Sequence, residues 1–262
     1  ECGFHRFLTE LGTPEPAEVP AAVWEAVYHT IDTPEKFQAF LLDLRKQPRF
    51  CIDTETTDLN PLLSSLVGVS VSWKQGEAYY LPVRGPIHEK VLNPAEVLEG
   101  LRPILADPNV EKIGQNIKYD MLSLGGAGVT FDGPITDTMI LSYLLESGER
   151  NHSLDQLSQR LLGHTMIPIT DLIGKGKKQI RMDLVEIPKV AEYAGEDADA
   201  TWRIAELLIP KVKEEGLWDL YVNVERPLIG ILARMEEAGV KVDTARLGRL
   251  STEFAAQLAT IE

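Results

Sequence analysis

The chain has 262 residues, of which 40 are acidic and 26 basic, giving a formal net charge of −14 at pH 7. This acidic balance argues against broad, non-specific clamping of duplex nucleic acid, although metal ions could still supply positive charge in a small site. No apolar run is long enough to cross a bilayer and the start does not resemble a signal sequence, so the sequence predicts no membrane partner. The two cysteines cannot form a disulfide framework, which favours a reducing, cytoplasmic location.

The first 22 residues are expected to lie outside the main domain. Residues 1–11 are typical of the end of a helix, and residues 12–20 have the Pro-rich, acidic composition of a linker. We therefore expect an N-terminal helix tail and linker at residues 1–22, followed by the main domain at residues 23–217.

Within residues 23–217, short apolar runs alternate with helical patterns. Thr33 is the expected N-cap of a helix that begins with Pro34, and residues 74–76 are the expected turn of a β-hairpin. This succession predicts an α/β domain with a central mixed β-sheet flanked by helices. The expected strands are residues 24–31, a segment beginning at Phe50, and residues 66–73, 78–83 and 110–113, and the further helices are residues 93–106, 117–124, 136–145, 153–162 and 189–213.

The last 45 or so residues have a different pattern. A long amphipathic helix is expected at 221–237, a turn and short strand at 239–243, and another helix from Thr244 to the end. The apolar stripe of this last helix has no partner in the sequence that follows, so residues 218–262 are expected to be the truncated, helical start of a second domain. The stripe consists of Leu247, Leu250, Phe254 and Leu258.

Two acidic residues end an apolar strand near the middle of this pattern. Because side chains alternate along a strand, Asp53 and Glu55 point to the same side. Two neighbouring carboxylates repel each other and raise each other's pKa, and a divalent cation between them is the usual remedy. A solvated strand end is the alternative, and the pair alone does not decide between the two.

Two further stretches carry acids of the same kind. Asp120 follows a strand and a glycine and falls in the first turn of a helix, which Asn116 is expected to cap. Tyr193 and Asp197 are four residues apart and share one helical face, whereas Asp199 is expected to point to solvent. Each signal alone also fits an ordinary helix, with an acid near the positive end of the dipole or a tyrosine in the core.

Taken together in this order, the stretches resemble the DEDDy-type 3′–5′ exonucleases, and among them the proofreading domain of bacterial family A polymerases. The matching motifs are Asp53-Thr54-Glu55-Thr56, the segment from Gly114 to Asp120, and the segment from Tyr193 to Asp199. Residues 137–139, 174–178 and 223–243 are also similar. The resemblance covers residue 24 to the end and implies a ribonuclease H-like exonuclease fold followed by the start of a polymerase domain.

The resemblance implies the chemistry as well. Asp53, Glu55, Asp120 and Asp197 would hold two divalent cations, Mg²⁺ or Mn²⁺, with Zn²⁺ as an alternative in one position. Tyr193 would orient the attacking water, since a phenol is a poor free base near neutral pH. The expected reaction is hydrolysis of the terminal phosphodiester at the 3′ end of single-stranded DNA or at a frayed primer terminus.

The family also implies contacts with the nucleic acid strand. The residues expected to make them are Thr54, Leu59, Gln115, Asn116, Tyr119 and Arg150. Leu59 would act as a wedge against the terminal base. The chain departs from the family at Asn151, before His152, and at Ile169, where an aromatic residue is common, and both changes concern the grip on single strands.

Two other functions remain open. One is an RNA 3′ exonuclease similar to ribonuclease D, with the same acidic set, against which the polymerase-like C-terminal segment argues. The other is a catalytically silent domain that only supports a polymerase domain of the same parent chain. Because all four acids and the tyrosine are present, we expect an active nuclease.

Overall fold

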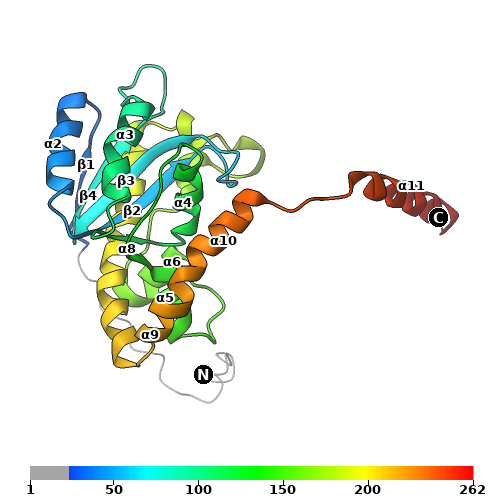
Figure 1. The fold of residues 1–262 in the computed structure, drawn as a ribbon. Helices are drawn as coiled ribbons and strands as arrows, with labels where there is room; N and C mark the ends of the chain where they lie inside the picture. Colours follow the sequence, from blue (N-terminus) through cyan, green and yellow to red (C-terminus); the bar gives the residue numbers. More distant parts are fainter. Residues whose placement is uncertain (1–23, 262) are drawn as a thin grey trace, which may run out of the picture.

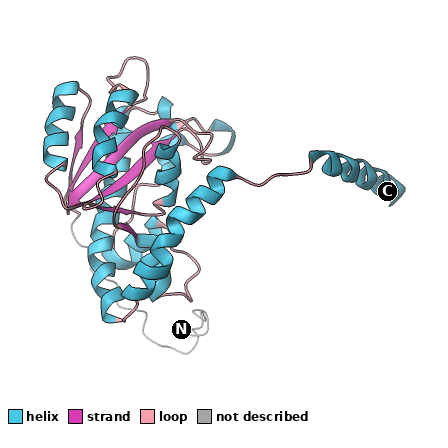
Figure 2. Ribbon diagram, in the orientation of Figure 1, coloured by secondary structure: helices cyan, strands magenta, loops and turns pink. Residues whose placement is uncertain are grey.

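Six β-strands form one mixed sheet in the order β1-β4-β3-β2-β5-β6 in the computed structural model, which describes residues 24–261 (Figure 1). The helix tail and linker expected at residues 1–22 lie outside the described residues. The predicted central mixed sheet with flanking helices is confirmed (Figure 2). The strands are β1 (Val27–Thr30), β2 (Arg49–Thr56), β3 (Leu66–Lys74), β4 (Glu77–Pro82), β5 (Glu111–Gly114) and β6 (Ile135–Asp137).

The centre of the sheet is antiparallel and its edges are parallel. β3 pairs with both β2 and β4 in antiparallel fashion, and the predicted hairpin of β3 and β4 turns at Gly76 with a φ of 77°, a conformation that suits glycine. The pairs β1–β4, β2–β5 and β5–β6 are parallel. Parallel neighbours require long crossover connections, which here contain helices. The helices between the strands are α2 (Pro34–Leu44), α3 (Pro94–Leu105) and α4 (Lys118–Gly125), and α5 (Thr138–Leu145) follows β6.

The two faces of the sheet carry different helices. Phe50 and Ile52 of β2 belong to a core with α2 and α3, which cover one face. Cys51 lies in a second core with the long helix α8 (Ile187–Glu214) on the opposite face. Since Asp53 and Glu55 alternate with the same period as Cys51, they face α8. Between α5 and α8 lie α6 (Leu154–Leu157), a π-helical segment η1 (Ser158–Leu162), α7 (Ile169–Ile173) and the 3₁₀ turns η2 (Gly176–Lys178) and η3 (Met182–Leu184).

Two expected helix starts differ from the structure. The helix expected at 136–145 begins with strand β6, and α5 starts only after Asp137, whose carboxylate accepts the N–H of Met139 at 2.9 Å. The expectation that Asn116 caps α4 is wrong. Asn116 has a φ of 57° and makes no side-chain cap, while its N–H and that of Ile117 are bound by Asp137.

The C-terminal segment packs on the sheet domain and then leaves it. The helix expected at 221–237 is interrupted, because Pro227 has no N–H to continue the α-helical bonds and a π-helical turn precedes it. The strand expected at 239–243 is wrong, since these residues form an unpaired link, and α11 (Thr244–Ile261) beyond it buries no residue (Figure 1). The segment before the link comprises α9 (Trp218–Leu220), η4 (Tyr221–Glu225) and α10 (Arg226–Ala238). Among residues 24–261, no helix has the length and apolar character that a membrane span requires.

Candidate active site

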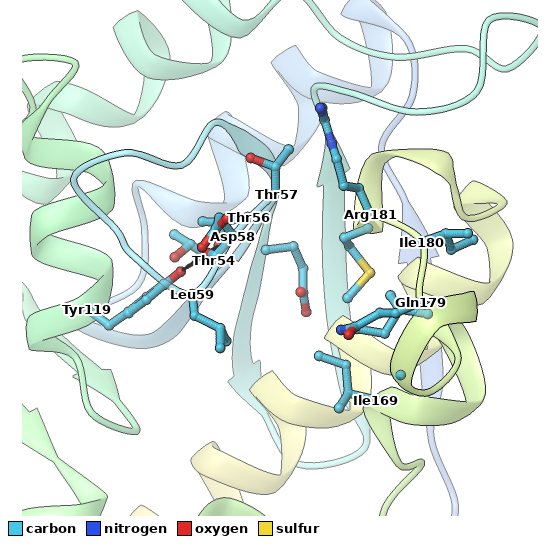
Figure 3. A pocket seen from close by; sticks show the side chains of 14 residues that line it. Thr54, Thr56, Thr57, Asp58, Leu59, Tyr119, Ile169, Gln179, Ile180 and Arg181 are labelled. Atoms are coloured by element: carbon cyan, nitrogen blue, oxygen red, sulfur yellow. Dashed lines mark hydrogen bonds between the residues drawn. The ribbon is translucent and has the colours of Figure 1, made fainter. Parts of the chain in front are cut away.

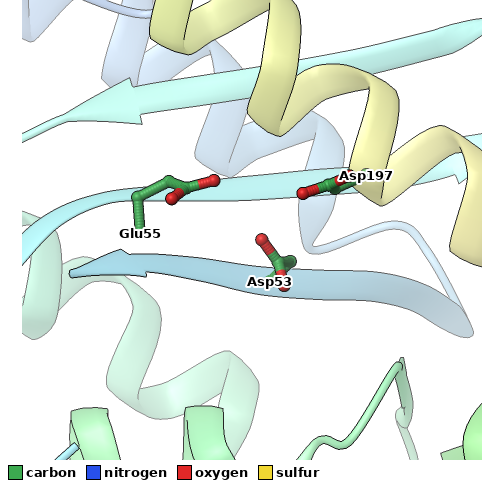
Figure 4. A group of neighbouring side chains, drawn as sticks. All are labelled: Asp53, Glu55 and Asp197. Atoms are coloured by element: carbon green, nitrogen blue, oxygen red, sulfur yellow. The ribbon is translucent and has the colours of Figure 1, made fainter. Parts of the chain in front are cut away.

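Three carboxylates from two elements meet between the sheet and α8. Asp53 and Glu55 lie two residues apart on β2, and Asp197 comes from α8. Each offers an oxygen within 4.8 Å of the oxygens of the other two (Figure 4). Figure 4 shows all three side chains turned toward a common point. Hard divalent cations prefer such oxygen ligands, so this donor set fits Mg²⁺ or Mn²⁺.

The fourth expected acid lies beside this group. Asp120 is buried in the first turn of α4 and is not one of the three clustered carboxylates. The hydroxyl of Thr54 donates a hydrogen bond of 2.6 Å to it. Because Thr54 alternates with Asp53 and Glu55 on β2, this hydroxyl approaches Asp120 from the other side of the strand. Thr54 therefore fixes the position of an acid, while its expected contact with nucleic acid stays a prediction.

Burial and mutual repulsion disfavour the charged forms of these acids. Burial raises the pKa of Asp53 to about 6. Burial, followed by the negative charge of Asp53, raises the pKa of Glu55, Asp120 and Asp197 well above the ordinary range. Positive charge nearby favours the ionised form of such a group, which is the electrostatic condition for cation binding.

Tyr193 lies one helical turn before Asp197 on the same face of α8. Burial and the charges of Asp197, Glu55 and Asp53 raise the pKa of its hydroxyl far above the ordinary value of 10. The raised pKa keeps the Tyr193 hydroxyl protonated near neutral pH. It can donate or accept a hydrogen bond but cannot act as an ionised base.

The residue expected to point to solvent, Asp199, is instead fully buried, so that expectation is wrong. It accepts hydrogen bonds from the N–H of Gly76 at 2.8 Å and from the guanidinium of Arg203 at 2.9 Å. The reason is that α8 lies against the sheet, so the side of α8 that carries Asp199 meets the β3–β4 turn rather than water. Gly195 allows this close packing, since a Cβ there would lie 2.6 Å from the ring of Tyr28. Asp199 thereby fixes the axial position of the helix that carries Asp197.

A cavity of about 570 Å³ opens beside Glu55 (Figure 3). Leu59, whose side chain is 90% exposed, and Tyr119 form one wall. Residues 169–182, including Ile169 and Arg181, form the other. The Tyr119 hydroxyl donates to the carbonyl oxygen of Asp58 at 2.8 Å, which ties α4 to the loop that presents Leu59.

The remaining residues expected to bind nucleic acid do not line this cavity. The side-chain amide of Gln115 is engaged within the protein, donating to the carbonyl oxygen of His152 at 2.8 Å and accepting from the hydroxyl of Thr138 at 2.5 Å. Arg150 is exposed in the loop between α5 and α6. Their roles, like that of Asn116, stay predictions.

Two contributions to the site were not among the predicted site residues. Asp137 is buried and binds four backbone N–H groups, from the residues before α4 and from the first turn of α5. Its position before an apolar helix is an N-cap signal, but only the fold shows that it also holds residues 116 and 117, which lead into the helix that carries Asp120. The second is the cavity wall at residues 179–182, in which Met182 packs in a core cluster with residues of α8.

The chain is similar in sequence to known proteins. The family model described as 3′-5′ exonuclease matches residues 28–213. A DNA polymerase I of Rhizobium leguminosarum is 36% identical over 90% of this chain, and one of Pseudomonas aeruginosa is 35% identical over 98%. The chain spans only 25% and 29% of the lengths of these two relatives.

Solved structures share the fold at lower identity. The POL domain of Pol1 from M. smegmatis, in complex with DNA primer-template and dNTP, superposes with a TM-score of 0.68 at 23% identity. The match covers 88% of this chain and 36% of that one. NrnC of Brucella melitensis with bound Mg²⁺ gives a TM-score of 0.59 at 22% identity, covering 84% of this chain and 98% of NrnC. These likenesses concern the fold, which is that of ribonuclease H-like exonucleases.

Proposed function

We propose, since the chain belongs to the 3′-5′ exonuclease family, that it removes nucleotides from the 3′ end of single-stranded DNA or of a frayed primer terminus by metal-dependent hydrolysis. The observation that carries the proposal is the meeting of Asp53, Glu55 and Asp197 beside an open cavity. The choice of DNA is supported by the relatives, which are DNA polymerases I. By the same reasoning, we propose that a polymerase domain of the same parent chain is its partner.

The residues fit two divalent cations, Mg²⁺ or Mn²⁺. Asp53, Glu55 and Asp197 would hold them, and Asp120 would complete the set from α4. All donors are carboxylate oxygens, and four negative charges balance two dications. Bound cations of this kind lower the pKa of an attacking water and neutralise the charge that develops on the leaving oxygen.

The protein's own groups prepare the reaction. Tyr193, neutral and beside Asp197, would hold the attacking water by hydrogen bonding and so fix its direction of approach. The cavity between Leu59 and residues 169–182 would receive the terminal nucleotide, with Leu59 separating the last base from its neighbour. Apolar and backbone contacts of this kind tolerate any base sequence, which suits removal of whichever nucleotide was misincorporated.

The test is a time course with single-stranded DNA labelled at its 5′ end, in Mg²⁺ or EDTA. Wild-type protein should produce a ladder of shortened products only with the metal. Asp197→Asn should reduce the rate at least about 10³-fold by removing a cation ligand, and Tyr193→Phe about 10²-fold by leaving the water unoriented. Glu99→Gln, an exposed carboxylate on α3, is the matched control and should cleave at the wild-type rate. Intact DNA in every lane would overturn the proposal.

The same assay separates the two alternatives. An RNA exonuclease would degrade a matched RNA oligonucleotide faster than the DNA. A silent supporting domain would degrade neither, and Asp53→Ala would change nothing.

A further inference from the structure

The hydroxyl of Tyr80 is buried without a partner next to the carboxylate group. Tyr80 lies in β4, only 1% of its side chain is exposed, and its hydroxyl oxygen makes no hydrogen bond within residues 24–261. A buried hydroxyl without a partner is unfavourable, so it calls for a reason. The hydroxyl of Ser70 in β3 is buried and unpaired in the same way.

Strand register places both hydroxyls in line with the acids. Asp53 pairs with Ser70 across β2 and β3, and Ser70 pairs with Tyr80 across β3 and β4. Directly paired residues of antiparallel strands point to the same face. Asp53, Ser70 and Tyr80 therefore form a row on the face that α8 covers, and Glu55 stands in the next row, opposite Gly68.

Gly68 shows where the phenol ring points. A Cβ on Gly68 would collide with the ring and the hydroxyl oxygen of Tyr80, so the ring lies across this glycine. Since Gly68 is the register partner of Glu55, the hydroxyl is directed along the row toward that carboxylate. The charge of Glu55 is accordingly a cause, after burial, of the raised pKa of Tyr80, which keeps the hydroxyl protonated as a donor.

Within residues 24–261, Glu55 is the acid of the group that lacks a hydrogen-bond donor. The Thr54 hydroxyl donates to Asp120, and the backbone N–H of Thr54 favours the charged form of Asp53. A hydroxyl aimed at Glu55 would supply what is missing.

We propose that Tyr80 is a positioning residue of the cation site, whose hydroxyl donates a hydrogen bond to Glu55 when that carboxylate binds a divalent cation. The proposal rests on the proposed function, because it concerns the same carboxylates. Gly68 is part of this arrangement, because only a residue without a side chain leaves room for the ring of Tyr80. Partners that orient metal ligands typically change metal affinity by about 10- to 100-fold when removed.

The test measures Mn²⁺ binding by calorimetry in the absence of DNA. Tyr80→Phe keeps the ring over Gly68 and removes only the hydroxyl, so we expect about tenfold weaker Mn²⁺ binding. The thermal midpoint of Tyr80→Phe in EDTA should equal or exceed that of wild type, because the substitution removes a buried hydroxyl that has no hydrogen-bond partner. The matched control is Tyr79→Phe, on the opposite face of β4, where the lost hydrogen bond of 2.6 Å goes to Glu77. This variant should bind Mn²⁺ like wild type.

A double-variant cycle shows whether the hydroxyl acts through Glu55. In a Glu55→Gln background, adding Tyr80→Phe should cause no further loss of Mn²⁺ affinity. Equal binding by wild type and Tyr80→Phe, or an unchanged loss in the Glu55→Gln background, would overturn the inference.

DNA cleavage keeps the two proposals apart. Wild-type protein that shortens DNA while Tyr80→Phe binds Mn²⁺ normally contradicts the role of Tyr80 alone. Wild-type protein that shows the Tyr80 effect on Mn²⁺ but leaves DNA intact contradicts the exonuclease alone. Wild-type protein that binds no Mn²⁺ contradicts both.

Discussion

Asp53 is a buried acid with two other carboxylates, Glu55 and Asp197, close by. Burial raises its pKa to about 6, whereas a hydrogen bond from Lys36 lowers the pKa of the partly exposed Asp32. The opposite signs reflect opposite functions. Asp32 is stabilised in its charged form by the folded protein itself, while Asp53 gains its charge at the expense of the fold. Ionised Asp53 destabilises the folded protein, and a bound cation offsets this destabilisation.

The first prediction concerns pH. The pKa of Asp53 is about 6 in the folded protein and 3.8 without the fold, so between these values the folded state binds more protons. Stability without metal should therefore fall as pH rises through this range, in addition to the trends set by other groups. Asp53→Asn removes this contribution and should be more stable than wild type near pH 7 by on the order of 1–2 kcal/mol, allowing for the partial exposure of Asp53.

The measurement is urea unfolding in EDTA at about pH 4 and about pH 7, compared between wild type and Asp53→Asn. The gap between the two proteins should open as pH rises, and Mn²⁺ should close or reverse it at about pH 7 by stabilising wild type alone. Glu99→Gln serves as the control with no pH-dependent gap. A gap that stays constant with pH would show that Asp53 ionises freely in the fold.

Local periodicity is what made the acids predictable at this scale. Asp53 and Glu55 share a face because strands repeat every two residues, and Tyr193 and Asp197 share one because helices repeat every 3.6. Asp199 was not predictable in this way. Its partners Gly76 and Tyr28 lie 123 and 171 residues away in the sequence, so only the assembled sheet shows that its surroundings are protein.

Asp137 joins three elements at the edge of the sheet. Its Oδ1 accepts the N–H groups of Asn116 at 3.1 Å and Met139 at 2.9 Å, and its Oδ2 accepts that of Ile117 at 2.9 Å. The end of β6, the start of α5 and the residues before α4 are thereby held by one carboxylate. Since α4 carries Asp120 and Tyr119, this joint sets their position relative to β2.

The second prediction tests this joint. In Asp137→Asn an NH₂ group replaces one oxygen and faces a backbone N–H, so at least one buried donor loses its acceptor. We expect a loss of about 2–3 kcal/mol in the free energy of unfolding, measured by urea titration. Asp132→Asn, an exposed acid in the preceding loop, should change stability by less than about 0.5 kcal/mol. A stable Asp137→Asn variant with full nuclease activity would contradict the role of the joint.

Long or strongly patterned elements were predictable from the sequence, whereas the three-residue strand β6 was not. The hairpin of β3 and β4 follows from alternation around a glycine turn, and α8 follows from its length and apolar face. The three residues of β6 are too few to show a period, and they become a strand through pairing with β5. The carboxylate of Asp137, an acceptor for both neighbouring elements, then separates that strand from α5.

At the scale of the whole molecule, the segment after α8 divides into two parts with different packing. Tyr221 is completely buried, donating to the carbonyl oxygen of Ile135 at 3.0 Å and accepting the N–H of Asp137 at 2.8 Å. Ile229 of α10 is part of the core on the far face of the sheet. By contrast, α11 buries no residue. We infer that residues up to 238 contribute to the stability of the nuclease, although a second domain is expected to begin at residue 218.

The last prediction compares two deletions. Removing residues 239–262 takes away the unpaired link and α11, so the free energy of unfolding should stay within about 0.5 kcal/mol of the full chain. Removing residues 218–262 takes away the buried Tyr221 and should cost at least about 3–5 kcal/mol, as for truncation of a large buried side chain.

The substitution Tyr221→Phe isolates the role of the hydroxyl. It keeps the ring but leaves the N–H of Asp137 without an acceptor, and should cost about 1–3 kcal/mol. Tyr143→Phe, on a half-exposed ring, is the matched control. Urea unfolding and DNA cleavage should rank the variants in the same order, because the hydroxyl of Tyr221 and the carboxylate of Asp137 connect this segment to α4 and Asp120. If the shorter protein lacking residues 218–262 unfolded at the same urea concentration as the full chain, the nuclease would be complete at residue 217 and the packing of Tyr221 would contribute nothing to it.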